Sequence, residues 1–391
     1  MFDNPQCDAN FMSHESRPLL THSIWANQFV FDPAQIHVVG IFRGEGIGPE
    51  LVPAAMSILS ILQEHTKRKF ELREGGLIGS EAKKTHGKSL TEQTIEFANE
   101  IFKSHGALFC GPGGERFVYE LRREFDLFCK FTPLKPMSAL IGTGPLKSEI
   151  TAAADIVAVR ENLGGLYQGE SSTEFNEQDG AVVTHKFSYT ERMVRRILEV
   201  AFNLAGERRN RLHVVTKPGG IQAISQLWSD CANEIAKNHN VELFEQEIDN
   251  AIYQLVANPS QYDVIVSPNM FGDVIADCGA LLLGSRGLSY SGNFDGLGHG
   301  VYQTGHGAAY DIASKDLANP LGQILSLGMM LSESFNWPEA EQVLLKAIDI
   351  TLQQGYRTKD IAVPSAKTLG TRTYAKQIEN NLRKILEGKI I

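Results

Sequence analysis

The stretch SPNMFGDVIADCGALLLGS, residues 267–285, places Asp273 and Asp277 four positions apart among residues that are otherwise small or apolar. It follows the strand-like run VIV at 264–266, so a helix packed beside a buried strand is expected. Like charges four apart on a helix repel each other. Three explanations are open: a solvated helix face, a helix N-terminus whose dipole favours Asp273, and a cation held between the carboxylates. The apolar neighbours argue against a solvated face.

Strand-like and helical runs alternate around this stretch, which predicts an α/β fold with a largely parallel sheet. Helical patterns cover 91–104 and 189–205, and Pro49 is well placed to open another helix. The strand-like runs are 36–42, 107–113, 154–162, 211–219 and 262–268. The polar segment 170–188 breaks the rhythm, and we expect either a surface hairpin or an arm that pairs with another subunit.

Composition restricts the class of protein. The chain has 391 residues, 42% of them hydrophobic, which is enough for a two-lobed unit or two to three domains. A net charge of −9 argues against nucleic acid as the main partner but allows a small anionic substrate. The five cysteines form no CxxC motif, which favours reduced thiols in a cytoplasmic protein. No apolar run is long enough to predict a membrane span.

Several polar residues lie where α/β proteins often bind ligands. Arg122 and Arg160 suit two-point recognition of carboxylates, although most single arginines are surface charges. Tyr167 could act as a general acid, and Lys217 ends a predicted strand, where such sheets place ligand groups. The turn RGEGIGPE at 43–50 matches neither the dinucleotide fingerprint nor a P-loop.

Five motifs, taken together and in order, resemble the isocitrate/3-isopropylmalate dehydrogenase family of metal-dependent β-decarboxylating dehydrogenases. The resemblance extends from about residue 36 to 385, and "GGLYQG" is closer to the isopropylmalate branch. The motifs are GEGIGPE (44–50), LRREFDLF (121–128), VRENLGGLYQG (159–169), NMFGDVIADCGA (269–280) and GHGAAYDIASKDLANP (305–320).

The resemblance implies a two-lobed α/β fold with a central cleft, not of the Rossmann type. Residues 36–127 plus 286–391 would form the large, cofactor-binding lobe, and 128–285 the small lobe. An arm at about 165–188 would join a homodimer whose active sites are shared between subunits. Residues 1–35 would be an N-terminal extension.

The implied reaction is NAD-dependent and Mg²⁺- or Mn²⁺-dependent oxidative decarboxylation of a 3-substituted malate, a 2-hydroxy acid, to a 2-oxo acid. The implied catalytic residues are Tyr167, which would protonate the enol, and Lys217, which would transfer the hydroxyl proton; Lys217 and the metal ligand Asp249 would come from the other subunit. The implied binding residues are Arg122, Arg160, Val118 and Thr132 for the substrate, Glu115, His306, Gly307, Asp311, Ile312 and Asn319 for the cofactor, and Asp249, Asp273 and Asp277 for the metal. Asp311 would accept hydrogen bonds from ribose hydroxyls and repel a 2′-phosphate, which favours NAD over NADP.

Departures from the family pattern bear on the substrate. Thr132 stands where the family has its second carboxylate-binding arginine, so either Lys130 or Lys135 compensates or the substrate differs. Arg116 and Val118 disfavour isocitrate, and Arg116 fits neither branch.

Three further positions depart from the family motifs: Glu45, Gly219 and Gln303. Together with Thr132, the last two motivate an alternative, a non-catalytic or regulatory paralogue that keeps the fold and dimerises. The retained aspartates argue against this alternative, because an idle site has little reason to keep carboxylates that repel each other.

Overall fold

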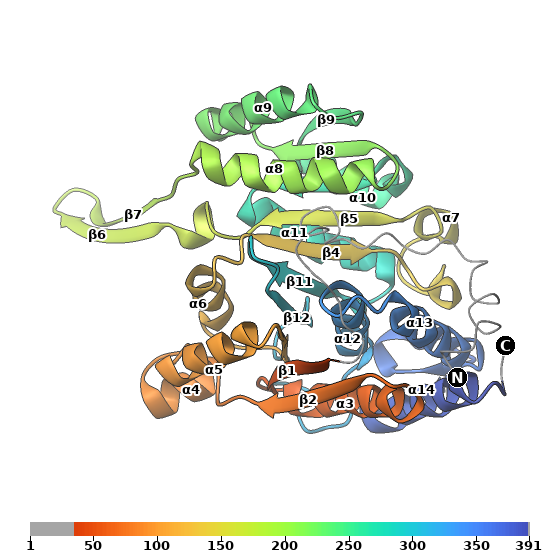
Figure 1. Ribbon diagram of the computed structural model, residues 1–391. Coiled ribbons are helices and arrows are strands. Elements are labelled where there is room, and N and C mark those ends of the chain that lie inside the picture. Colours follow the sequence, from red (N-terminus) through yellow and green to blue (C-terminus); the bar gives the residue numbers. More distant parts are fainter. Residues whose placement is uncertain (1–34, 390–391) are drawn as a thin grey trace.

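A ten-stranded mixed sheet organises the fold of residues 35–389, the part of the chain described by this computed structural model (Figure 1). The strand order is β2-β1-β3-β12-β11-β4-β5-β10-β8-β9. The strands are β1 (Ile36–Phe42), β2 (Lys69–Glu74), β3 (Ala107–Cys110), β4 (Cys129–Leu134), β5 (Ile156–Glu161), β8 (Arg211–Thr216), β9 (Glu242–Glu247), β10 (Val264–Ser267), β11 (Tyr290–Phe294) and β12 (Gly300–Thr304).

Both flanks of the sheet are parallel, as the alternating sequence pattern predicted, but its centre is antiparallel. β1 pairs in parallel with β2 and β3, and β12 with β3. On the other flank, β10 pairs in parallel with β5 and β8, and β8 with β9. The three central pairings, β12–β11, β11–β4 and β4–β5, are antiparallel.

Helices pack on both flanks of the sheet. Figure 1 shows α8 and α9 beside β8 and β9 at one end, and α3 and α14 beside β1 and β2 at the other. The helices are α3 (Gly48–His65), α4 (Gly79–His86), α5 (Glu92–Lys103), α6 (Phe117–Glu124), α7 (Ser148–Thr151), α8 (Glu191–Gly206), α9 (Gln222–Ala236), α10 (Ile248–Ala257), α11 (Asn269–Leu283), α12 (Leu321–Glu333), α13 (Pro338–Gln353) and α14 (Thr371–Leu386).

α12 is the central helix, because every one of its residues is buried. A helix that is apolar all round needs partners on all sides, and α12 packs against β11, β12, α3 and α13. The central strands β3, β4, β11 and β12 contribute fully buried aromatic side chains to this core: Phe109, Phe131, Phe294 and Tyr302. The main core therefore runs through the middle of the sheet and joins its two flanks.

An antiparallel hairpin, β6 (Glu170–Asn176) and β7 (Gly180–Lys186), projects away from the sheet (Figure 1). The sequence predicted a hairpin or an arm here. Its apolar side chains are open to solvent: Phe175 is 79% and Val183 is 69% exposed. Exposed apolar side chains on a projecting hairpin are typical of a surface that pairs with another chain.

Each of the two predicted lobes supplies five adjacent strands of the sheet. Residues 36–127 and 286–391 supply β1, β2, β3, β11 and β12, and residues 128–285 supply the other five strands. The lobe boundaries themselves stay a prediction, and the predicted extension 1–35 lies outside the described residues apart from its last position. Between residues 35 and 389, no helix combines the length and apolarity needed to cross a membrane.

Candidate active site

Three buried cations converge where β4, β5 and α6 meet. Arg122 in α6, Lys130 in β4 and Arg160 in β5 are 4%, 6% and 3% exposed. Burial, reinforced by the charge of Arg160, lowers the pKa of Arg122 to about 9. Burial, followed by the charges of Arg122 and Arg160, lowers the pKa of Lys130 to about 7. Such crowding of like charge is costly unless an anion completes the site.

Arg160 is the only one of the three that the described residues neutralise. It forms an ion pair with Asp273, and its Nε and Nη2 donate to Oδ1 of Asn269 at 3.1 and 2.8 Å. Neither the guanidinium of Arg122 nor the ammonium of Lys130 has a hydrogen-bond or ion-pair partner within residues 35–389, and Nε of Arg122 is a buried donor left without one. Arg122 and Lys130 therefore lack a direct hydrogen-bond or ion-pair partner among the described residues, and the carboxylate of Asp273 acts on both without contacting either.

Asn269 is the first residue of α11, and its side chain fixes the position of Arg160. Its amide nitrogen Nδ2 donates to the carbonyls of Asn162 and Gly164, each at 2.9 Å, while its oxygen holds Arg160. Gly272, one turn further, allows this close approach, because a Cβ there would lie 2.7 Å from Cβ of Arg160. The NMFGD motif thus positions an arginine on the neighbouring strand.

Tyr167 lies near Asp273, in the short 3₁₀ helix η2 (Leu166–Gln168). The guanidinium carbon of Arg160 is 5.6 Å from the centre of its ring. Burial, and next the carboxylate of Asp273, raise the pKa of Tyr167 to about 12. Its hydroxyl therefore carries a proton at neutral pH and is able to donate it.

Asp273 and Asp277 occupy one side of α11, and each is paired with an arginine. Burial works against ionisation of Asp273, but Arg160, Lys130 and Arg122 together lower its pKa. Asp277 is exposed and pairs with Arg286 at 2.9 Å. The first turn of α11 contains no acid, so the explanation based on the helix N-terminus is wrong.

The apolar neighbours of the two aspartates do not all face the core, contrary to the expectation from the sequence. Val274 and Leu281 are 44% and 40% exposed, and they share one side of α11 with Asp277. Tyr253 in the adjacent α10 is 69% exposed. This side of α10 and α11 is a second exposed apolar surface, in addition to the β6–β7 hairpin.

The remaining predicted catalytic and metal residues form a separate group. Nζ of Lys217 donates to Glu247 at 2.5 Å and to Asp249 at 2.7 Å. These hydrogen bonds raise the pKa of Lys217 and lower that of Asp249. Within residues 35–389, no three His, Cys, Asp or Glu side chains gather as a metal site, so Asp249 does not join Asp273 and Asp277 within one chain.

Most of the predicted cofactor residues lie in the loops that follow β3 and β12, at the carboxyl ends of these strands, where α/β sheets bind ligands. The turn after β1 contacts the loop after β12: the amide of Ile47 donates to the carbonyl of Ala308 at 2.9 Å. Gly46 has φ +58°, and a Cβ there would lie 2.0 Å from that carbonyl oxygen.

Glu45, one of the departures from the family motif, joins these loops. Its buried carboxylate accepts from the amides of Glu81 at 2.6 Å and Gly114 at 2.5 Å. The hydroxyl of Tyr310 also donates to it, at 3.2 Å. Glu45 therefore fixes the edge of the candidate cofactor site, which the sequence did not predict.

Four predicted cofactor residues, His306, Gly307, Asp311 and Ile312, lie in the loop after β12. His306 Nδ1 contacts the carbonyl of Gly307 at 3.1 Å, and burial lowers the pKa of His306. Asp311 is exposed, and its carboxylate has no partner within residues 35–389. Ile312 packs against Ile47 and anchors the loop.

Other predicted residues are engaged elsewhere. Both polar atoms of Asn319 are used: Oδ1 accepts from the amide of Leu321 at 2.9 Å, and Nδ2 donates to Asp360 at 3.0 Å. Glu115 accepts from Lys83 at 2.8 Å.

The predicted substrate-pocket residues lie near the three cations. Val118 is partly buried in α6, and Thr132 is buried in β4, two positions from Lys130 and therefore on the same face of the strand. Arg116 donates to the backbone carbonyl of Tyr167 at 3.3 Å, and its guanidinium lies 5.3 Å from the ring centre of Tyr119. Arg116 thus stabilises the position of η2.

Two residues central to the geometry were missed or left open by the sequence. Asn269 lay inside the NMFGD motif, but nothing in its spacing showed that it would hold Arg160. Lys130 was one of two alternatives, and only its burial distinguishes it from Lys135.

The donor chemistry fits both implied groups. Asp273 and Asp277 offer the oxygen ligands that Mg²⁺ and Mn²⁺ prefer, and residues 35–389 of one chain supply only these two acids here. The carboxylate of Asp311, unpaired within that range, suits the hydroxyls of a ribose. The same loop has open space at Gly307, because a Cβ added there would meet no described atom within 4 Å.

The family description "Isocitrate/isopropylmalate dehydrogenase" matches residues 38–378. The 3-isopropylmalate dehydrogenase of Aquifex aeolicus is 37% identical over 363 residues, covering 90% of this chain and 98% of that protein. That of Carboxydothermus hydrogenoformans is 38% identical over 335 residues, covering 83% and 89%.

Among solved structures, isocitrate dehydrogenase from Methylococcus capsulatus superimposes with a TM-score of 0.78 at 27% identity, covering 89% of this chain and 100% of that one. The sequence-based assignment is confirmed, including the closer likeness to the isopropylmalate branch. The chain belongs to the isocitrate/isopropylmalate dehydrogenase family and is an oxidative decarboxylating dehydrogenase.

Proposed function

We propose that the protein catalyses NAD-dependent and Mg²⁺- or Mn²⁺-dependent oxidative decarboxylation of a 3-substituted malate. One observation carries the proposal: three buried cations, two of them unpaired within residues 35–389, lie beside Asp273 and Tyr167. A substrate with two carboxylates supplies the missing negative charge. The relatives' shared name, 3-isopropylmalate dehydrogenase, supports the same substrate class.

The chain's own residues account for binding and proton transfer. Arg122 and Arg160 bind carboxylates of the substrate, with Arg160 held in place by Asn269. Once the 2-oxo acid has lost its β-carboxyl group as CO₂, Tyr167 donates its proton to carbon 3 of the enol. Bound NAD would supply the hydride acceptor, and a divalent cation held by Asp273 and Asp277 would supply Lewis-acid stabilisation of the negative charge that develops on the substrate.

Lys217 and Asp249 take part from the other subunit of a homodimer. Two observations support this arrangement: both residues belong to a group separate from Asp273, and the exposed apolar surfaces of the β6–β7 hairpin and of α10 and α11 are suited to a partner. Hydrogen bonds to Asp249 and Glu247 raise the pKa of Lys217, so its proton-transfer role would require a weaker contact with these two carboxylates than the single chain shows.

NADH formation with a panel of 3-substituted malates, with and without Mg²⁺ or Mn²⁺, tests the proposal. The expected result is metal-dependent turnover of at least one member and a preference for NAD over NADP. Absence of turnover on every member, together with no metal binding by calorimetry, would overturn it and favour the non-catalytic alternative.

A further inference from the structure

Lys130 is a buried ammonium that faces the active site. Its register neighbour in the antiparallel β4–β5 pair is Arg160, so the two side chains lie on the same face of the sheet. Asn293 of β11 is the neighbour on the other side. Lys130 is 6% exposed and has no hydrogen bond or ion pair to any residue in 35–389. Leaving such a group unpaired costs stability, and a bound anion removes that cost.

The charge balance at the site defines the kind of anion. Arg160 is compensated by Asp273, and Asp277 by Arg286. Arg122 and Lys130 remain, one from α6 and one from β4. Two cations on different elements match two carboxylates better than one, because each can approach a separate group of the ligand.

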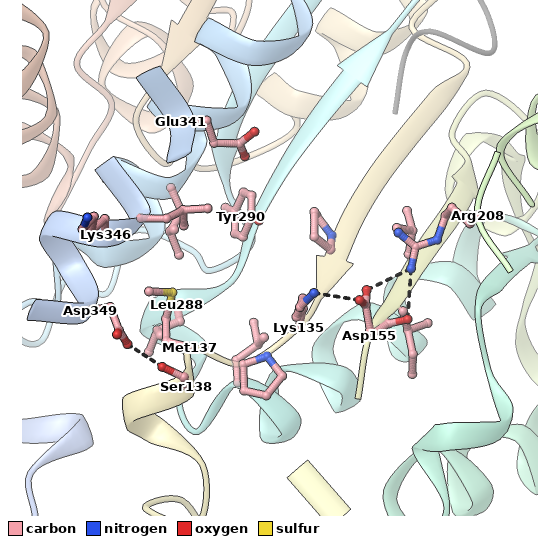
Figure 2. Close-up of a pocket in the computed structure, with 17 residues that line it drawn as sticks. Lys135, Met137, Ser138, Asp155, Arg208, Leu288, Tyr290, Glu341, Lys346 and Asp349 are labelled. Atoms are coloured by element: carbon pink, nitrogen blue, oxygen red, sulfur yellow. Dashed lines mark hydrogen bonds and ion pairs between the residues drawn. The ribbon is translucent and has the colours of Figure 1, made fainter. Parts of the chain in front are cut away.

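Lys135, the other candidate to replace the missing arginine, lies elsewhere. Its Nζ donates to Asp155 at 2.8 Å, and Asp155 also accepts from Arg208 at 2.9 Å. Lys135, Asp155 and Arg208 line a cavity of about 290 Å³. Figure 2 shows them on one side of it, with the hydrogen-bonded pair Ser138 and Asp349 on the other side. The cavity involves Pro133 and Lys135 at the end of β4, whereas Lys130 lies near the beginning of that strand.

The geometry points to Lys130 as a carboxylate-binding residue that sets the requirement for a second carboxylate in the substrate. This inference rests on the proposed function. It assigns to Lys130 the contact with the second carboxylate, which the family's arginine would make at the position of Thr132. An ammonium gives a compact single contact instead of the planar fork of an arginine, so it holds a carboxylate without fixing its orientation. The site therefore accepts dicarboxylates whose second carboxylate lies at a different angle from that in an arginine-bearing relative.

Malonate, a dicarboxylate without a hydroxyl group, separates this role from catalysis. Its affinity is measured by calorimetry at pH 6.5 in the absence of cofactor and metal, for the full chain and for Lys130→Met, Lys130→Arg and Lys135→Met. We expect Lys130→Met to weaken malonate binding by about 10- to 100-fold, the range for loss of one charged hydrogen bond. Lys130→Arg should retain most of the affinity, and Lys135→Met should bind as the original protein does.

Two further readouts distinguish binding from a structural role. Lys130→Met should keep or raise the melting temperature, because it removes an unpaired buried charge; a structural lysine would give the opposite result. With a substrate that turns over, KM should rise at least tenfold while kcat changes much less. Acetate, which has one carboxylate, should bind equally weakly to both proteins.

The outcomes also separate this inference from the proposed function. Unchanged malonate affinity in Lys130→Met, an equal loss in Lys135→Met, or no malonate binding by the original protein overturns the role of Lys130. Normal malonate binding that depends on Lys130, without turnover of any malate, overturns the proposed reaction and leaves the binding role intact.

Discussion

Asn269 holds Arg160 through a single side-chain oxygen, which accepts from Nε at 3.1 Å and from Nη2 at 2.8 Å. The same amide donates to two backbone carbonyls, so its orientation is fixed from both ends. The ion pair with Asp273 alone would leave the guanidinium of Arg160 free to rotate about that contact. Asn269 thus positions Arg160, the arginine proposed to bind the substrate.

Asn269→Ala should therefore lower kcat/KM by about 10- to 100-fold, chiefly through KM, because Arg160 loses its second support. It should also lower the free energy of unfolding by about 1–3 kcal/mol, since buried polar groups are left unpaired. Steady-state kinetics and denaturant unfolding measure both effects. Asn233→Ala, which removes an exposed asparagine in α9, is the matched control and should change neither quantity. Normal KM in Asn269→Ala would contradict the positioning role.

Mixing two inactive variants tests whether the active site is shared between subunits. Tyr167→Phe and Lys217→Ala should each abolish most activity as homodimers. After the two are unfolded and refolded together, mixed dimers should contain one site with both residues intact, giving about one quarter of the original activity. Each variant refolded alone provides the control. Recovery that never exceeds the separate variants would place both residues of each site in one subunit.

The cofactor preference should depend on the charge of Asp311. Its carboxylate would repel a 2′-phosphate, so Asp311→Asn should raise kcat/KM for NADP by about tenfold. The asparagine keeps a hydrogen-bond acceptor for ribose, so the KM for NAD should change only a few-fold. Initial rates with the two cofactors measure this, and an unaltered NADP rate would show that another group excludes the phosphate.

Acid stability should depend on His213 in β8, which lies far from the proposed metal ligands in sequence. Burial, followed by the charge of Arg211, lowers the pKa of His213 from 6.5 to about 4, and its Nδ1 is a buried atom without a partner among the described residues. Because folding depresses this pKa, the contribution to stability is complete above pH 6.5 and is lost as the pH falls towards 4. The loss is about 3 kcal/mol at most.

His213→Phe should remove that part of the pH dependence, since the ring stacks on Phe244 without a titratable group. The free energy of unfolding, measured between pH 4 and 7, should fall less steeply for this variant than for the original protein. His86→Gln, at an exposed position of α4, is the control and should keep the original slope. Parallel curves for His213→Phe and the original protein would contradict the assignment.

The sequence predicted the flanks of the sheet better than its centre. The β-branched runs of β1, β8 and β10 stand out because strands buried on both faces are continuously apolar. β4 contains Lys130, Thr132 and Pro133, and proline weakens any strand prediction. The position of β4 in the sheet is set by its antiparallel partners β5 and β11, and β11 is distant from it in sequence, so local pattern could not predict it.

Residue type and motif selected the candidate site residues, but they did not predict the state of charge of these residues. Motifs identified Arg122, Arg160 and Asp273, whereas burial and pairing decide which charges are compensated. Lys130 and Lys135 look equivalent in sequence, and they are separated by the burial of Lys130 and by the contact of Lys135 with Asp155. Pairing of this kind depends on the folded neighbourhood rather than on local pattern.

The junction of the sheet halves is a single ladder, in which Cys129 of β4 is opposite Phe294 of β11. The chain enters the 128–285 half beside that point and leaves it at residue 285, only five positions before β11 begins. The strands that lead in and out are therefore adjacent, about 5 Å apart. A rotation of one half of the sheet against the other would have to twist the β4–β11 ladder. Because Lys130 lies in this ladder, opposite Asn293, such a rotation would also change the position of Lys130.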